Sequence, residues 1–418
     1  MGAGPSGIFA TAELLKRTDV HVDVFDAAPT PFGLVRYGVA PDHPRIKSVT
    51  ATLSAVLADP RVRFHGNVRY GTDLHLPDLQ RACAATLFAT GAPRSRRLGI
   101  PGEDLPGNHA AADLVSWYNG HPDGRQPGWD RPARTVAVIG GGNVSLDVAR
   151  VLLKGGAGLA TTDVPDDVLT ALDRYRVSQV HVIARRGAVD VRFSPAELRE
   201  LDALGCDIVV DPADLELTRD EQARCVTDRA ATQRREIFAT WAAQSRAGTP
   251  KRLTFLFHRR TVAVTGPGRV GSLQLEGPGG SEELAVEAVV RSIGHHGEPL
   301  PGLPFDAERG LVPNVRGRVA AGIHVAGWIK RGPSGVIGSN KACAIESVRE
   351  LLAELDEGPA PDVPLGSVLR DRGCHVVDWP GWTGIDAAEI ALGRERGRAR
   401  TKIVDRGRLL TAAAATTR

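Results

Sequence analysis

The chain has 418 residues, which is enough for two or three domains. Hydrophobic residues make up 42% and charged residues 24% of the sequence, as in ordinary globular proteins. The 52 basic and 49 acidic side chains leave a net charge of +3, too small to indicate a nucleic acid partner. No apolar run approaches the length of a membrane span, and no signal peptide is visible.

The five cysteines are scattered, and the sequence contains no C-x-x-C motif. A dithiol redox centre or a cysteine-bound cluster is therefore not expected, and no metal site is predicted. The scatter fits a reducing compartment, so a cytoplasmic location is predicted. The arginines between residues 394 and 408 are interpreted as a solvated surface.

The first motif in chain order is the G-x-G-x-x-G turn of Gly2, Gly4 and Gly7. A periodic helix follows to about residue 17, and a predicted strand over residues 20–25 ends at Asp26. Asp26 comes 19 residues after Gly7. An acidic residue at that place is typical of a dinucleotide site, where it hydrogen-bonds a free ribose hydroxyl.

The strand that normally leads into such a turn is missing, because Met1 directly precedes Gly2. In this kind of unit the first strand lies centrally in a parallel sheet and positions the phosphate turn. Its loss would remove several buried apolar side chains, each worth about 1.5–3 kcal/mol. We therefore expect that Met1 is not the natural start and that roughly 5–10 further residues form the strand.

Residues 29–44 are rich in proline and glycine, which indicates a shaped loop. Ordered loops of this length in compact domains are usually functional. A helix over residues 46–57, an edge strand over 62–68 and a strand over 87–92 are predicted next. The segment 101–107 is interpreted as a crossing point, which gives one discontinuous domain of residues 1–104 and 297–418 and a second domain of residues 105–296.

The most complete motif is RTVAVIGGGNVSLDVAR at residues 134–150. Its β-branched run over 136–139 predicts a buried parallel strand. Gly140, Gly142 and Ser145 then form a G-x-G-x-x-S turn into a helix whose N-terminus offers unpaired N–H groups to phosphate. Gly140 permits the tight turn, Gly142 lets the backbone approach a pyrophosphate, and Ser145 lets the helix pack close to the strand.

A strand over residues 180–184 ends in Arg185 and Arg186, where the first unit has its acid. Guanidinium groups at that place suit a 2′-phosphate, which they can bind bidentately, although two surface arginines by chance are the alternative. The two units therefore predict two different dinucleotides, FAD at the first and NADP at the second. Ser194 and Glu197 have the spacing of a capping box at the start of a helix.

The rest of the chain alternates predicted strands and helices. Strands are expected at residues 253–257, 261–264, 289–294 and 323–328. A glycine-rich loop over 329–340, a helix over 340–355, a linker over 357–364 and a helical, basic C-terminal piece follow. The predicted fold class is α/β with two Rossmann-like domains, of which the first is discontinuous and lacks its first strand.

Several stretches resemble ferredoxin–NADP⁺ reductases of the adrenodoxin-reductase type, especially the actinobacterial NADPH–ferredoxin reductases. They are GAGPSG (2–7), PTPFGLVRYGVAPDHPRIK (29–47), FHGNV (64–68), ATGA (89–92), IPGEDLPG (100–107), GGGNVSLDVAR (140–150), ARRG (184–187), RSIG (291–294), PGLPF (301–305), GWIKRGPSGVIGSNK (327–341) and DWPGWTGIDAAE (378–389). Thioredoxin reductases need a C-x-x-C and glutamate synthase small subunits carry a cysteine cluster, so both are disfavoured.

The resemblance implies an oxidoreductase that passes hydride from NADPH to FAD and then single electrons to a ferredoxin-type iron–sulfur protein. It implies FAD contacts at Gly2, Gly4, Ser6, Gly7, Asp26, Leu34, Val68, Trp328, Gly335, Val336 and Ile337. It implies NADP contacts at Arg96, Gly140, Gly142, Asn143, Val144, Arg185, Arg186 and Glu197. His43 and Glu200 match positions close to the flavin–nicotinamide contact, which makes them the catalytic candidates.

Arg234 and Arg235 lie on a predicted helix where the family has arginines that dock its iron–sulfur partner, although two solvated helix residues would look the same. Two other functions remain open. One is an NADPH-dependent flavin oxidase, diaphorase or monooxygenase. The other is a non-catalytic remnant that only binds NADP.

Overall fold

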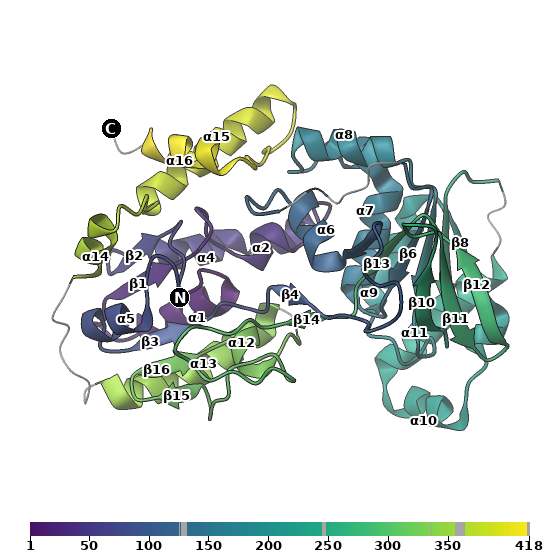
Figure 1. Ribbon diagram of the computed structural model, residues 1–418, viewed down its shortest axis with the longest axis horizontal. Coiled ribbons are helices and arrows are strands. Elements are labelled where there is room, and N and C mark those ends of the chain that lie inside the picture. The colour runs from purple at the N-terminus through teal and green to yellow at the C-terminus, as the bar shows by residue number, and fades with distance from the viewer. Residues whose placement is uncertain (125, 127–131, 245–247, 336, 356–363, 416–418) are drawn as a thin grey trace. The chain divides into compact units, whose positions relative to one another are not determined.

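The structure is a computed structural model that describes residues 1–124, 126, 132–244, 248–335, 337–355 and 364–415. The chain forms two compact units (Figure 1). The first contains Met1–Arg94, Asn119–Pro122 and His295–Arg418, and the second contains Ser95–Tyr118 and Asp123–Gly294. Residues 95–104, predicted from the sequence to belong to the first domain, fall in the second unit by this division.

Five strands of the first unit form two small sheets. β1 (Val22–Phe25) pairs in parallel with β2 (Val62–His65), while β16 (Ile323–Val325) pairs in parallel with β3 (Thr86–Phe88) and antiparallel with β15 (Arg318–Ala320). The described residues before α1 (Pro5–Leu14) form no strand, as predicted. Their backbone instead connects the two sheets, because the Gly2 N–H donates to Phe25 O at 2.7 Å and Met1 O accepts the Ala89 N–H at 2.7 Å.

The helices of the first unit cover these sheets and include the C-terminal piece. They are α1, α2 (Leu34–Tyr37), α3 (Pro44–Lys47), α4 (Thr50–Leu57), α5 (Leu76–Ala82), α12 (Trp328–Arg331), α13 (Ile337–Leu355), α14 (Leu365–Asp371), α15 (Trp379–Glu395) and α16 (Arg406–Ala414). Trp382 and Ile385 of α15 share one apolar core with Leu53 of α4 and Phe64 of β2. The C-terminal helices are therefore an integral part of this unit.

Several local predictions in the first unit are corrected. The loop over 29–44 contains the short helix α2, the helix predicted over 46–57 is divided into α3 and α4, and α13 begins at Ile337 rather than at residue 340. Residues 357–363 of the predicted linker lie outside the described residues. The basic tail is not a uniform solvated surface, because Arg398 and Lys402 are buried.

The second unit is built around a six-stranded parallel sheet. Its order is β5 (Asn108–Ala110), β13 (Ala288–Arg291), β6 (Thr135–Ile139), β7 (Gln179–Ile183), β9 (Arg252–Leu256) and β8 (Asp207–Val210). Successive side chains of a strand point to opposite faces, and both faces are buried here. Val136 and Val138 of β6 belong to one apolar core, while Ala137 and Ile139 belong to another.

Helices and a small antiparallel sheet complete the second unit. The helices are α6 (Ala111–Tyr118), α7 (Asn143–Leu159), α8 (Asp166–Tyr175), α9 (Pro195–Glu200), α10 (Arg219–Thr227) and α11 (Arg229–Ala243), with the 3₁₀ turns η1 (Leu201–Leu204) and η2 (Pro212–Leu215). β10 (Arg260–Thr265), β11 (Ser272–Gly277) and β12 (Gly280–Ala285) form the antiparallel sheet. Its Leu273 and Leu275 pack in the same core as Ala137 of β6, so this sheet covers one face of the parallel sheet.

The chain passes between the units near β4 (Arg94–Ser95) and β14 (His295–His296), which pair with each other. The predicted α/β class with two Rossmann-like units is confirmed. Among the described residues, no helix combines the length and the apolar composition that crossing a membrane requires.

Candidate dinucleotide-binding sites

The glycine turn before α1 is tightly built at one end and open at the other. A Cβ atom on Gly7 would lie 1.9 Å from Gly2 O, so the close approach of helix and turn requires glycine there. A Cβ atom on Gly4 would meet nothing closer than 3.9 Å, at Gly33 Cα. The fold therefore does not need glycine at residue 4, and the space beside it is free for a ligand.

Asp26, directly after β1, receives two backbone hydrogen bonds. Its Oδ2 accepts the Ala3 N–H at 2.8 Å and its Oδ1 accepts the Ala28 N–H at 2.9 Å. Burial raises the pKa of the Asp26 carboxyl, and the two N–H groups oppose this shift. Each carboxylate oxygen has a second lone pair, so Asp26 can still accept a hydrogen bond from a ribose hydroxyl.

The segment from Gly327 to Arg331 lies against the first turn. A Cβ atom on Gly327 would come within 2.3 Å of Ser6 Oγ, so the two predicted FAD segments meet at this glycine. The Gly327 N–H donates to the buried Cys343 Sγ at 3.3 Å. The next residue, Trp328, has an indole N–H that is buried and has no partner among the described residues. An unpaired buried donor of this kind suits an acceptor atom of a ligand.

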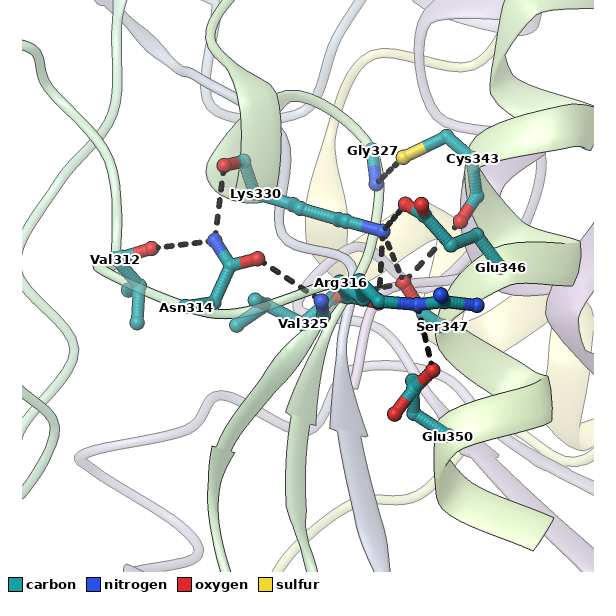
Figure 2. A network of polar contacts seen from close by, with 11 residues as sticks. Val312, Asn314, Arg316, Val325, Gly327, Lys330, Cys343, Glu346, Ser347 and Glu350 are labelled. Carbon is teal, nitrogen blue, oxygen red and sulfur yellow. Dashed lines mark hydrogen bonds and ion pairs between the residues drawn. The ribbon is translucent and has the colours of Figure 1, made fainter. Parts of the chain in front are cut away.

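A buried lysine holds α12 in place (Figure 2). Lys330 Nζ donates to Arg316 O at 3.1 Å, to Ser347 Oγ at 2.9 Å and to Glu346 Oε2 at 2.5 Å. Asn314 Nδ2 donates to Lys330 O at 3.1 Å, so the carbonyl at the end of α12 is satisfied as well. The network fixes the short helix that begins with Trp328.

The other predicted residues of the first unit differ in accessibility. Leu34, on α2, is 46% exposed, so its apolar side chain is accessible to a ligand. His43 is buried at the start of α3. Val68 is a core residue, and its N–H donates to Asp26 O at 2.9 Å. Gly335 is exposed and Ile337 begins α13, while Val336 lies outside the described residues.

In the second glycine turn, as in the first, one glycine is tightly packed and another borders open space. Gly140 has a φ of 151°, and a Cβ atom there would lie 2.1 Å from Ser292 O. Gly142, the N-cap of α7, has an extended backbone that any residue can adopt, and a Cβ atom there would meet nothing within 4 Å. Ser145 is fully buried beside Gly140, as predicted. The open position lies at the helix N-terminus, where unpaired N–H groups favour an anion.

Asn143 connects this turn to the next predicted site helix, α9. Asn143 Oδ1 accepts the Ser194 N–H at 2.8 Å, and Ser194 Oγ accepts the Glu197 N–H at 3.2 Å. Ser194 is therefore the predicted N-cap, but the predicted capping box is wrong, because Asn143 rather than the Glu197 carboxylate takes the Ser194 N–H. The Glu197 carboxylate instead lies 3.8 Å from Nη1 of the buried Arg150.

Arg185 and Arg186 follow the end of β7, the strand that pairs with β6 in the parallel sheet. Both are exposed, and their guanidinium groups have no ion pair among the described residues. Val144, another predicted contact, is 37% exposed at the start of α7. Arg96 is exposed, and its N–H donates to Gly294 O at 3.0 Å. Glu200 is exposed at the end of α9.

Arg234 and Arg235 have different environments on α11. Arg235 is exposed, but Arg234 is buried and its Nη2 donates to Val189 O at 2.7 Å. The prediction that Arg234 presents its charge at the surface is therefore wrong, since its guanidinium lies in the interior of the unit. Only Arg235 of this pair can meet a partner directly.

Sequence reasoning missed the buried residues that support these sites. Lys330 and Arg150 lie inside stretches that carry the family resemblance, but no role was predicted for either. Arg36 and Glu389 form a buried ion pair whose members are 353 residues apart in the chain. The stretches that carry the resemblance were the only signal for these residues, and they do not show which partner each side chain reaches.

Comparisons with known proteins agree with this architecture. The family model described as pyridine nucleotide-disulphide oxidoreductase matches residues 1–239. The chain belongs to the pyridine nucleotide-disulphide oxidoreductase family. The resemblance to ferredoxin reductases of the adrenodoxin-reductase type is likewise confirmed by full-length relatives.

Two relatives and one solved structure illustrate the similarity. The chain is 40% identical to NADPH-ferredoxin reductase FprA of Mycobacterium tuberculosis, over 98% of this chain and 97% of that protein. It is 36% identical to the mitochondrial NADPH:adrenodoxin oxidoreductase of Arabidopsis thaliana, over 99% and 94%. The structure of Mycobacterium tuberculosis FprA in complex with NADPH superposes with a TM-score of 0.93 at 38% identity, over 99% of this chain and 98% of that one.

Proposed function

We propose that this chain is an FAD-dependent NADPH:ferredoxin oxidoreductase, with FAD in the first unit and NADP in the second. The observation that carries the proposal is the difference in charge between the residue that follows β1 in the first unit and the residues that follow β7 in the second. Asp26 offers a carboxylate after β1, whereas Arg185 and Arg186 offer two exposed, unpaired guanidinium groups after β7. A carboxylate suits a free ribose hydroxyl, and guanidinium groups suit the 2′-phosphate that distinguishes NADP from NAD.

The residues of the first unit fit FAD. The free space beside Gly4 and the N-terminus of α1 suit its pyrophosphate. The unpaired indole N–H of Trp328 and the exposed apolar side chain of Leu34 suit a flat ring with polar edges. The other proposed FAD contacts are Gly2, Ser6, Gly7, Asp26, Gly335, Val336 and Ile337, together with the backbone of Val68.

The residues of the second unit fit NADP. Gly142 leaves space at the N-terminus of α7 for a pyrophosphate, and Gly140 keeps the turn tight below it. The neighbouring Asn143 uses its side chain to position Ser194, so its backbone N–H remains for the phosphate. The other proposed NADP contacts are Arg96, Val144, Arg185, Arg186 and Glu197.

The chemistry of the reaction belongs to the cofactor: FAD, when bound, takes two electrons from NADPH and releases them one at a time to an iron–sulfur protein. The protein binds and orients both dinucleotides, and no side chain has to act as a nucleophile. His43 and Glu200 remain the candidate catalytic residues.

The proposed partner is a small acidic ferredoxin, with Arg235 as a docking residue. Electrostatic docking of this kind weakens as salt is added. A reducing, cytoplasmic location stays a prediction.

The first experiment replaces Arg185 and Arg186 together with serine. Each lost charge-assisted hydrogen bond to the 2′-phosphate costs about 1.5–3 kcal/mol, so the NADPH KM should rise steeply while the NADH KM changes little. Equal losses with both nucleotides would contradict the proposal. A replacement of the equally exposed, unpaired Arg229 by serine is the control for the loss of a surface arginine.

Visible spectra separate this function from the two alternatives. The purified protein should show a flavin spectrum that NADPH bleaches and oxidised ferredoxin restores faster than oxygen does. Faster recovery with oxygen would favour a flavin oxidase. A colourless protein that still binds NADPH would favour a non-catalytic remnant.

A further inference from the structure

The turn that carries Arg185 and Arg186 packs against residues of α10 and α11 and against His258, which follows β9. This turn, residues 184–190, follows β7 and is called the arginine turn here. Its two guanidinium groups point to no protein partner, so their positions depend on how firmly the backbone of the turn is fixed. Three sets of contacts fix it.

The middle of the arginine turn packs on a buried carboxylate and a histidine. A Cβ atom on Gly187 would lie 1.9 Å from Oε1 of Glu221 and 2.7 Å from Nε2 of His258. Glu221 is buried on α10, where its Oε2 accepts the Thr218 N–H at 2.9 Å. The His258 N–H donates to Arg186 O at 3.3 Å. A side chain at residue 187 would therefore have to displace the Glu221 carboxylate and the His258 ring.

The far end of the arginine turn is anchored by two arginines of α10 and α11, which lie side by side (Figure 1). Arg224 Nε lies 2.7 Å from Asp190 Oδ1, although this pair is partly exposed. Arg234 is 8% exposed, and its Nη2 donates to Val189 O at 2.7 Å. Asp228 Oδ2, 3.5 Å from the same nitrogen, offsets its charge.

Of these contacts, the one from Arg234 has the greatest effect. A hydrogen bond from a charged donor is stronger than a neutral one, and a buried one is not weakened by water. Without it, Val189 O would be a buried acceptor with no donor, and the turn would shift to find one. Such a shift would displace Arg185 and Arg186, which lie four and three residues before Val189 in the chain.

We infer that Arg234 is a positioning residue for NADPH selectivity, because its buried guanidinium fixes the turn that presents Arg185 and Arg186 to the 2′-phosphate. The inference rests on the proposed function of those two arginines. It gives α11 a part in nucleotide selection that is independent of docking an iron–sulfur partner. Bidentate binding demands that two guanidinium groups keep their spacing and angle, so a small movement of the turn affects the 2′-phosphate more than the rest of the nucleotide.

The test compares the affinities of 2′,5′-ADP and 5′-ADP, measured by calorimetry on the full chain as purified with its flavin. In Arg234→Met, the affinity for 2′,5′-ADP should fall about fivefold or more, while that for 5′-ADP stays within twofold. Arg234→Lys, which restores a charged donor, should recover part of the loss. Arg229→Met is the matched control, because Arg229 lies on the same helix but is exposed and unpaired among the described residues.

The outcomes separate this inference from the proposed function. If the Arg185→Ser and Arg186→Ser double variant keeps the preference for 2′,5′-ADP, the proposed NADP site is wrong. If the double variant loses the preference but Arg234→Met behaves like Arg229→Met, the positioning role is wrong. An equal loss for both ligands in Arg234→Met, with Arg234→Lys giving no recovery, would also overturn it. Circular dichroism and the thermal midpoint check that each variant is folded.

Discussion

The buried ion pair between Arg36 and Glu389 allows a quantitative test of how the C-terminal helices support the first unit. Arg36 Nη2 lies 2.5 Å from Glu389 Oε1, and the two side chains are 6% and 0% exposed. Glu389 also accepts the Ile403 N–H at 3.0 Å and lies 3.1 Å from Arg400 Nη1. Burial alone would lower the pKa of Arg36, but the Glu389 carboxylate outweighs burial and raises it.

Replacing Glu389 with glutamine leaves the Arg36 charge buried with a neutral partner. Removing one member of a buried pair costs about 3–5 kcal/mol. For a unit of this size each kcal/mol lowers the thermal midpoint by roughly 2–4 °C, so the expected fall is roughly 6–20 °C. Since Arg36 lies on α2 together with the exposed Leu34, the dissociation constant for FAD should rise as well.

Differential scanning calorimetry and flavin fluorescence measure the two effects. The control is Glu395→Gln on the same helix, α15, where the pair with Arg396 is 3.5 Å long and its side chains are 69% and 35% exposed. An exposed pair contributes about 0–1 kcal/mol, so this variant should unfold close to the parent. Adding Arg36→Met to Glu389→Gln should recover part of the stability. Equal midpoints for Glu389→Gln and Glu395→Gln would refute the reasoning.

Two further predictions concern the second unit. Gly142→Ala should weaken NADPH binding but leave the thermal midpoint unchanged, because the added Cβ atom meets nothing within 4 Å. Gly140→Ala should lower the midpoint, because its Cβ atom would lie 2.1 Å from Ser292 O. Equal losses of stability in the two variants would contradict this prediction. Burial and Arg291 lower the pKa of His109 to about 4, so the stability that neutral His109 contributes is complete above its ordinary pKa of 6.5 and is lost as the pH falls toward 4. His109→Gln should therefore give a shallower loss of thermal stability over this range, and an unchanged slope would contradict it.

Local features of the fold could be predicted from the sequence because their causes are local. The strand–turn–helix unit at residues 135–159 combines a β-branched run, a tight glycine and a small serine within one segment. The same holds for the N-cap role of Ser194, which depends on a backbone N–H three residues later. The second half of the predicted capping box was wrong, because Asn143, 51 residues away, competes for the Ser194 N–H.

The candidate site could be predicted only as a set of segments. Glycine spacing identified both turns, but it could not separate Gly142, where a side chain would have space, from Gly140, where it would clash. Burial of Val68 was equally hidden, since its role in the family motif gives no information about the direction of its side chain. Accessibility depends on packing between distant segments, which no local pattern records.

Arginines show most clearly why the remainder needed a structure. A guanidinium group is always charged, so a sequence suggests the surface for each one. Arg185 and Arg186 do lie at the surface, but Arg36, Arg150 and Arg234 are buried. Arg36 and Arg234 reach acceptors 353 and 45 residues away in the chain, whereas Arg150 pairs with Asp147 on its own helix. A buried charge needs such a partner, so removing the buried guanidinium group also affects the position of the segment that carries its acceptor. Arg36 affects the position of the loop that presents Leu34, and Arg234 affects the turn that presents Arg185 and Arg186. If Arg185 and Arg186 bind the 2′-phosphate as proposed, we expect their selectivity to depend on the buried Arg234 that fixes the backbone of their turn.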